Sequence, residues 1–169
     1  MERALVARLA WLARRRAVDL VAFGGGAGVK CILAGVDSSR ESGVAAHYAA
    51  DLARVTGARL ILACAVFVPD PLGDPELVAR TSVWEEEEHE RAEDLVRQVA
   101  TEVARRGVAS ETLVVGGPAA AALASLARDR GADLVVVGHR ERSALARVLT
   151  GSVVDQLLEI CPKPVLVVR

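Results

Sequence analysis

The sequence predicts an α/β fold, built as an open five-stranded parallel sheet with helices on both faces. Short runs of Val, Leu, Ile and Ala alternate along the chain with longer segments of helical character. A short, continuous apolar run is typical of a strand that is buried on both faces, and strands separated by helices form parallel sheets. Glycine or proline stands at most of the junctions, where it ends one element or begins the next.

The predicted elements follow one another from residue 30 onward. The strands are expected at 30–36, 59–68, 111–115, 133–137 and 165–168. The helices are expected at 41–56, 76–106, 118–130 and 152–160. Ser38 or Ser39 can cap the first helix and Gly57 can end it. The proline-rich segment 69–75 cannot continue the second strand and is expected to form a loop.

Size and composition narrow the possible functions. The chain has 169 residues, the length of one ordinary domain, and 52% of them are hydrophobic but only 3% aromatic. A net charge of −1 argues against a general nucleic-acid or anionic-membrane binder. No apolar run reaches the roughly 18 residues that a membrane-spanning helix needs. Cys31, Cys64 and Cys161 lie in or beside apolar runs, without zinc spacing, which indicates reduced thiols and a cytoplasmic protein.

Residues 1–28 differ from the rest and are expected to form an N-terminal extension to a domain at 29–169. Five arginines lie among Ala, Leu and Trp11, and a glycine-rich linker follows at residues 24–28. A basic amphipathic helix that lies on a membrane surface is one interpretation. Another is that translation begins downstream, so that residues 1–28 are not native.

The C-terminal part of the chain carries a candidate anion site. The apolar run 133–137 ends at Gly138, an arginine-rich loop follows at 139–147, and Gly151-Ser152 opens a helical segment. Glycine lets backbone N–H groups approach a phosphate closely, and the start of a helix supplies unpaired N–H donors with a positive dipole end.

These residues and three further segments resemble the universal stress protein family. Gly138, Gly151 and Ser152 resemble its phosphate-binding signature G-x2-G-x9-G-[S/T], in which Glu141 stands at the second glycine. The other segments resemble the family's first strand, the turn into its third helix and its closing strand: residues 32–39, 116–118 and 161–168. The resemblance covers about residues 30–169.

The resemblance implies a Rossmann-like, adenine nucleotide α-hydrolase-like fold with strand order 3-2-1-4-5. Strand order then reverses between strands 1 and 4, where ligands bind outside the carboxyl ends of the strands. The implied ligand is ATP with Mg²⁺, with AMP or ADP as alternatives. Asp37 would contact the adenosine, although it can also serve as a helix cap. The full set of implied binding residues is Gly35, Asp37, Val66, Gly138, Arg140, Gly151, Ser152 and Val153.

The last strand, Val165–Val168, lies at the sheet edge in this order and is apolar throughout. Such an edge presents unpaired N–H and C=O groups that invite pairing with another chain. The resemblance implies a homodimer formed by two-fold antiparallel pairing of this strand.

Three functions can be compared. The leading one is a non-enzymatic, cytoplasmic stress-response homodimer that hydrolyses ATP slowly or not at all. ATP orders its loop 138–151 and alters a surface for an unidentified regulatory partner. The second is a nucleotide-independent scaffold. Glu141 favours it, because a carboxylate about 4 Å from a phosphate charge costs about 1 kcal/mol in water and about 4 at an effective dielectric of 20. The third, a nucleotide-using enzyme such as an adenylyl transferase, would need an H-x-G-H sequence after the first strand, which is absent.

Overall fold

The computed structural model describes residues 18–21, 28–67, 75–139 and 153–169, with the backbone alone at 18–21 and 75–83. Its sheet has six strands in the order β1-β6-β5-β2-β3-β4. They are β1 (Val18–Val21), β2 (Cys31–Gly35), β3 (Arg59–Val66), β4 (Ser110–Gly116), β5 (Leu134–Gly138) and β6 (Val165–Val168). The helices are α2 (Arg40–Thr56), α3 (Pro75–Ala104), α4 (Ala119–Asp129) and α6 (Val153–Ile160).

The five strands from β2 to β6 are mutually parallel and confirm the expected order 3-2-1-4-5. The boundaries agree with the sequence interpretation to within about two residues, the usual uncertainty at element ends. The largest differences are at β3, which ends at Val66, and at α3, which ends at Ala104. Most of the predicted loop 69–75 lies outside the described residues, and Pro75 begins α3.

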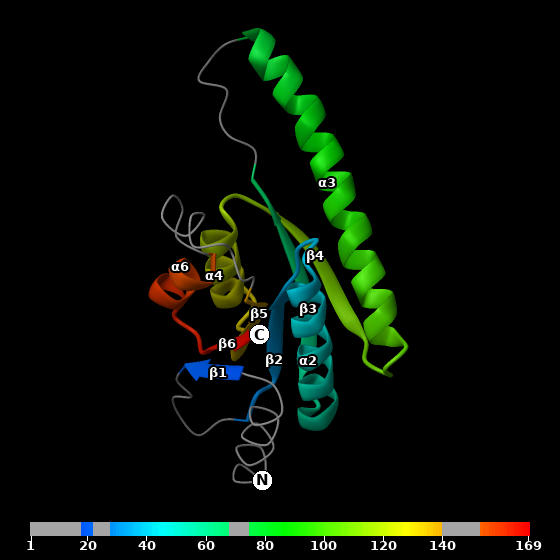
Figure 1. Ribbon diagram of the computed structural model, residues 1–169, viewed down its shortest axis with the longest axis vertical. Helices are drawn as coiled ribbons and strands as arrows, with labels where there is room; N and C mark the ends of the chain where they lie inside the picture. Colours follow the sequence, from blue (N-terminus) through cyan, green and yellow to red (C-terminus); the bar gives the residue numbers. More distant parts are fainter. Residues whose placement is uncertain (1–17, 22–27, 68–74, 140–152) are drawn as a thin grey trace.

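Helices cover both faces of the sheet, as predicted (Figure 1). Ile32 and Ala34 of β2 join a core cluster with α2 and α3, whereas Leu33 joins a second cluster with α4 and α6. This alternation follows from the two-residue repeat of a strand, and both faces are apolar because both are covered. A fully buried side chain such as Ile32 or Leu33 contributes about 1.5–3 kcal/mol relative to an exposed one.

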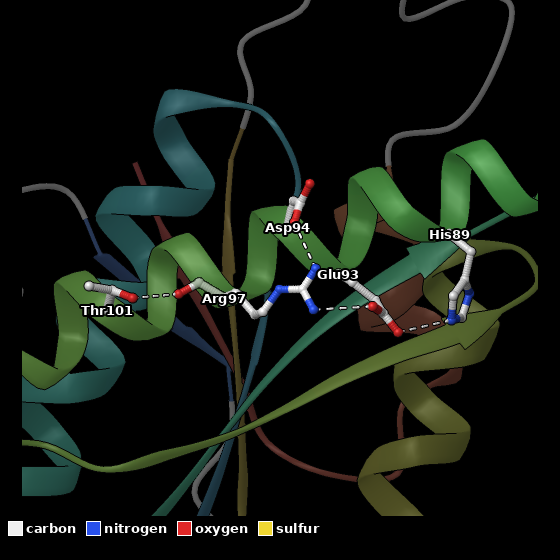
Figure 2. Close-up of polar contacts among 5 residues, drawn as sticks. All are labelled: His89, Glu93, Asp94, Arg97 and Thr101. Atoms are coloured by element: carbon white, nitrogen blue, oxygen red, sulfur yellow. Dashed lines mark hydrogen bonds and ion pairs between the residues drawn. The ribbon is translucent and has the colours of Figure 1, made fainter.

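Helix α3 spans 30 residues. Among its described side chains, the buried ones are Ala92, Val96, Val99 and Val103. Its N-terminal part extends beyond the end of the sheet (Figure 1). The acidic run at residues 85–90 is exposed, which confirms that it is a solvated helix face. Arg97 pairs with Glu93 and Asp94 one turn away, and His89 lies 3.6 Å from Glu93 (Figure 2). Exposed pairs of this kind contribute little to stability.

One expectation about the ends of the chain is corrected. Val165–Val168 is not the sheet edge, because β1 pairs with it in antiparallel register from Val18↔Val168 to Val21↔Val165. The N-terminal extension thus contributes a strand to the sheet. An apolar strand with an open edge leaves its peptide groups unpaired, and β1 satisfies them within the same chain. The expected amphipathic helix and the glycine run at 24–27 lie outside the described residues.

No helix among the described residues is long and apolar enough to cross a membrane.

Two glycines of α2 should respond oppositely to alanine. Gly43 lies inside the helix with open space around it, so Gly43→Ala should raise the free energy of unfolding by about 0.5–1 kcal/mol. Gly57 ends the helix at φ 71°, where an L side chain is strained, so Gly57→Ala should lower it by about 1 kcal/mol. Urea unfolding of both variants measures the two values. A shift in the same direction for both would contradict the described helix end.

Candidate functional site

The candidate site lies where the carboxyl ends of β2 and β5 meet. These strands are parallel neighbours, with Ala34 opposite Val136. After β2 the chain continues to β3 on one side of the sheet, and after β5 it continues to β6 on the other. Strand order therefore reverses between them, which is the position at which open parallel sheets bind ligands. The structure thus brings the strand ends at Asp37 and Gly138 side by side, as the sequence predicted.

Gly138 is required by the packing of backbone against backbone. A Cβ atom at this position would lie 2.4 Å from the carbonyl carbon of Glu41, 2.5 Å from its oxygen and 2.6 Å from the amide nitrogen of Ser42. The backbone of the first turn of α2 thus packs directly against the backbone at the end of β5. The sequence interpretation gave Gly138 a role in phosphate approach alone, and the contact with α2 adds a structural role.

Asp37 is held by the start of α2. Its Oδ1 accepts a hydrogen bond from the Ser39 backbone N–H at 2.9 Å and another from the Ser39 hydroxyl. Ser39 in turn caps α2, since its side chain accepts from the Ser42 N–H at 3.2 Å. The cap of α2 is therefore Ser39, so the interpretation of Asp37 as the helix cap is wrong. Asp37 is exposed, and its carboxylate is held by the capping residue just before the helix begins.

Ser42 is the residue that sequence reasoning missed. It is only 4% exposed, and its hydroxyl lies 2.7 Å from the Asp37 carbonyl oxygen and accepts from the Asp37 N–H at 3.1 Å. It thereby joins the end of β2 to the first turn of α2. The signal was present as the spacing of Ser39 and Ser42, which are the cap and third positions of a helix start.

Gly35 and Val66 end neighbouring strands, β2 and β3. A Cβ at Gly35 would meet Leu123 Cδ1 at 2.8 Å and Val137 Cγ1 at 3.2 Å, so this glycine lets α4 pack closely. The Val66 carbonyl accepts from the Gly117 N–H at 2.8 Å, which ties the ends of β3 and β4 together. Both residues lie at the carboxyl edge of the sheet.

Of the segment 138–153, which is expected to surround the phosphates, the structure describes only the two ends. His139 follows Gly138 and donates its backbone N–H to the Val168 carbonyl at 2.7 Å. Val153 begins the described part of α6 and is 43% exposed, whereas Val154 packs in the core. Arg140, Gly151 and Ser152, with Glu141, lie outside the described residues.

A cavity of about 710 Å³ opens beside Val66, between the ends of β3 and β4 and the N-terminal part of α3. Four α3 residues line it, namely Glu85, Glu86, His89 and Glu90, together with Phe67, Gly116 and Gly117. Its carboxylates disfavour a phosphate there. In the part of the chain that the structure describes, no group of three His, Cys, Asp or Glu residues could hold a metal ion.

The pKa of the Cys64 thiol depends on the charges at this end of the sheet. Burial raises the pKa of its thiol, and the carboxylates of Asp37 and Glu88 raise that pKa further. All three effects favour the protonated form, so the thiol is a neutral core group and a poor nucleophile.

The comparisons with known proteins identify the family of the chain. The universal stress protein family model matches residues 28–169, and the chain belongs to that family. A universal stress protein of Synechocystis is 30% identical over 158 residues, which cover 94% of this chain and 96% of that protein.

Solved structures give the same result. The UspA universal stress protein of Lactobacillus plantarum superposes with a TM-score of 0.74 at 26% identity, over 85% of this chain and 100% of its own. A universal stress protein crystallised in complex with cAMP superposes with a TM-score of 0.64, also at 26% identity, over 85% and 98% of the two chains.

Replacing Gly138 by alanine should destabilise the fold. The added methyl group meets backbone atoms that cannot rotate away, so we expect a loss of about 1–3 kcal/mol in the free energy of unfolding. Gly116→Ala is the matched control, because it also ends a strand but has nothing within 4 Å of the added Cβ. Equal effects of the two changes in urea unfolding would contradict the close contact between β5 and α2.

Removing the charge of Asp37 should lower the pKa of the Cys64 thiol. Asp37→Asn deletes one of the two carboxylates that raise it, whereas burial keeps it above its ordinary value. The alkylation rate of the Cys64 peptide as a function of pH, followed by mass spectrometry, measures the change. Asp129→Asn, at the end of α4, should leave the profile unchanged. An unchanged profile in Asp37→Asn would place the carboxylate away from β3.

Proposed function

We propose that the chain is a non-enzymatic, cytoplasmic stress-response regulator that binds an adenine nucleotide in the crevice between β2 and β5. The proposal rests mainly on one observation: Ser39 holds the Asp37 carboxylate at the reversal point of strand order, beside the end of β5. Membership of the universal stress protein family supports it. The related structure in complex with cAMP supports an adenine nucleotide as the ligand class.

In this proposal the two sides of the crevice bind different parts of the nucleotide. Asp37 accepts hydrogen bonds from the adenosine, and the backbone at Gly35 and Val66 lines the base. Gly138, Arg140, Gly151, Ser152 and Val153 surround the phosphates, where the N-terminus of α6 contributes unpaired N–H groups and a favourable dipole. Mg²⁺ enters with ATP. Nucleotide binding orders the loop 138–151 and thereby changes a surface that a regulatory protein recognises.

A nucleotide-independent scaffold of the same fold is the second candidate. Glu141 favours it, because the family's signature has glycine at that position and a carboxylate there repels a polyphosphate. AMP and cAMP carry fewer charges than ATP and are repelled less. Weaker binding of ATP than of AMP and cAMP would therefore indicate that the Glu141 carboxylate repels the phosphates.

The homodimer expected from the sequence is also retained as a proposal. Two-fold pairing through β6 requires its outer edge, and β1 occupies that edge in the described structure. A second copy can pair there only after β1 leaves.

Isothermal titration calorimetry with AMP, cAMP, ADP and ATP–Mg²⁺ tests the nucleotide proposal. The unchanged chain should bind AMP, and Asp37→Asn should weaken that binding about tenfold or more, the cost of losing a charged hydrogen bond. Asp129→Asn should bind as the unchanged chain does. Glu141→Gly should strengthen ATP binding more than AMP binding.

Two other outcomes are informative. If only Glu141→Gly binds nucleotide, the scaffold function is correct and the site has lost its ligand. If neither the unchanged chain nor Glu141→Gly binds any of the four nucleotides at millimolar concentration, the proposed crevice is not a nucleotide site. Unfolding curves of Asp37→Asn must accompany the titration, because Asp37 also orders the start of α2.

A further inference from the structure

Strand β1 closes the outer edge of β6 over its whole length. All four residues of β1 pair with all four residues of β6 in antiparallel register. With β1 in place, every residue of β6 is 3% exposed or less. Without it, Val165–Val168 would present an apolar edge with unpaired peptide groups, the kind of surface that pairs with another chain.

The hydrogen-bonding directions along β6 can be assigned. The Pro164 carbonyl accepts from Val135 N–H at 2.9 Å, and the Val168 carbonyl accepts from His139 N–H at 2.7 Å, so both face β5. Because peptide groups alternate in direction along a strand, those of Val165 and Val167 face the opposite edge, toward β1.

The register then distinguishes neighbouring residues of β1. Asp19 lies opposite Val167 and Val21 opposite Val165, so Asp19 and Val21 direct their N–H groups toward β6. Leu20 lies opposite Leu166, whose peptide groups face β5, so the Leu20 N–H points away from β6. Adjacent residues thus differ in whether their N–H contributes to the pairing.

β1 has the properties of a strand that ends a sheet. It is four residues long and contains an acidic residue, Asp19, and short charged edge strands resist pairing with other chains. A six-residue segment, 22–27, joins it to the described part of the domain and contains Gly24, Gly25 and Gly26. A short glycine-rich tether gives a segment an effective concentration on the order of millimolar at its site.

We propose that β1 is an intramolecular cap that competes with a second copy of this chain for the outer edge of β6. Two-fold homodimerisation through β6, on which this inference rests, then occurs only in chains whose β1 has left the sheet. At micromolar protein concentration the tethered strand outcompetes a second copy, because its effective concentration is higher. Release of β1 exposes the complete edge and lets two β6 strands pair.

Sedimentation velocity of five proteins tests this competition. They are the full chain, a chain that begins at Gly28, and the full-chain variants Asp19→Pro, Leu20→Pro and Asp19→Ala. The shortened chain retains all of residues 28–169, the region that the family model matches. The Lactobacillus plantarum structure is matched over 100% of its length by 85% of this chain.

The full chain should be monomeric at micromolar concentration, and the shortened chain should dimerise with a dissociation constant at least about tenfold lower. Asp19→Pro removes an N–H that faces β6 and should behave like the shortened chain. Leu20→Pro removes an N–H that faces away, which edge strands tolerate, and should behave like the full chain. Asp19→Ala separates loss of the side chain from loss of the N–H and should remain monomeric.

Each other result overturns a defined part of the proposal. A monomeric shortened chain would eliminate both the cap and the homodimer through β6. Equal dimerisation of the full and shortened chains would eliminate the cap and leave the homodimer standing. Oligomers larger than a dimer would also contradict it, since two-fold pairing of one edge closes on itself. Equal behaviour of Asp19→Pro and Leu20→Pro would contradict the assigned pairing of β1.

Discussion

The architecture of the candidate site depends on one contact between backbones. Gly138 lets the first turn of α2 lie against the end of β5, with no side chain between them. The buried Ser42 hydroxyl fixes the same turn to the end of β2 through Asp37. One helix start is therefore held by two neighbouring strands, and this arrangement holds the Asp37 carboxylate at the point where strand order reverses. The geometry of the candidate site is thus a consequence of packing.

The two edges of the sheet differ. β4 ends the sheet on one side, contacts α3 and is at most half-buried along its length. On the other side β6 is entirely apolar, and β1 from the N-terminal extension pairs with it. Because an open apolar edge favours association, the extension links the folding of this chain to its possible association with a second copy. Nucleotide binding and self-association would then use separate parts of the same sheet.

The sequence was sufficient for the main elements, because each apolar run is bounded by glycine, proline or a capping serine. It was insufficient for β1, since Val18–Val21 is short, contains Asp19 and follows an arginine-rich segment that resembles a helix. Ser42 lies within a predicted helix, where a serine is usually exposed. The contact of Gly138 with Glu41 joins residues far apart in the chain, and only the assembled sheet brings them together. Asp37 could be located because it directly follows a buried strand.

The central claim is that an adenine nucleotide binds where β2 and β5 end. Backbone amide chemical shifts of the ¹⁵N-labelled full chain, recorded during addition of AMP, test it most directly. The account predicts the largest shifts at residues 37–42, at Val66, at residues 138–139 and at residues 153–154, with none at the opposite end of the sheet around Gly107. Shifts confined to the acidic cavity beside α3, or spread evenly over the chain, would contradict it.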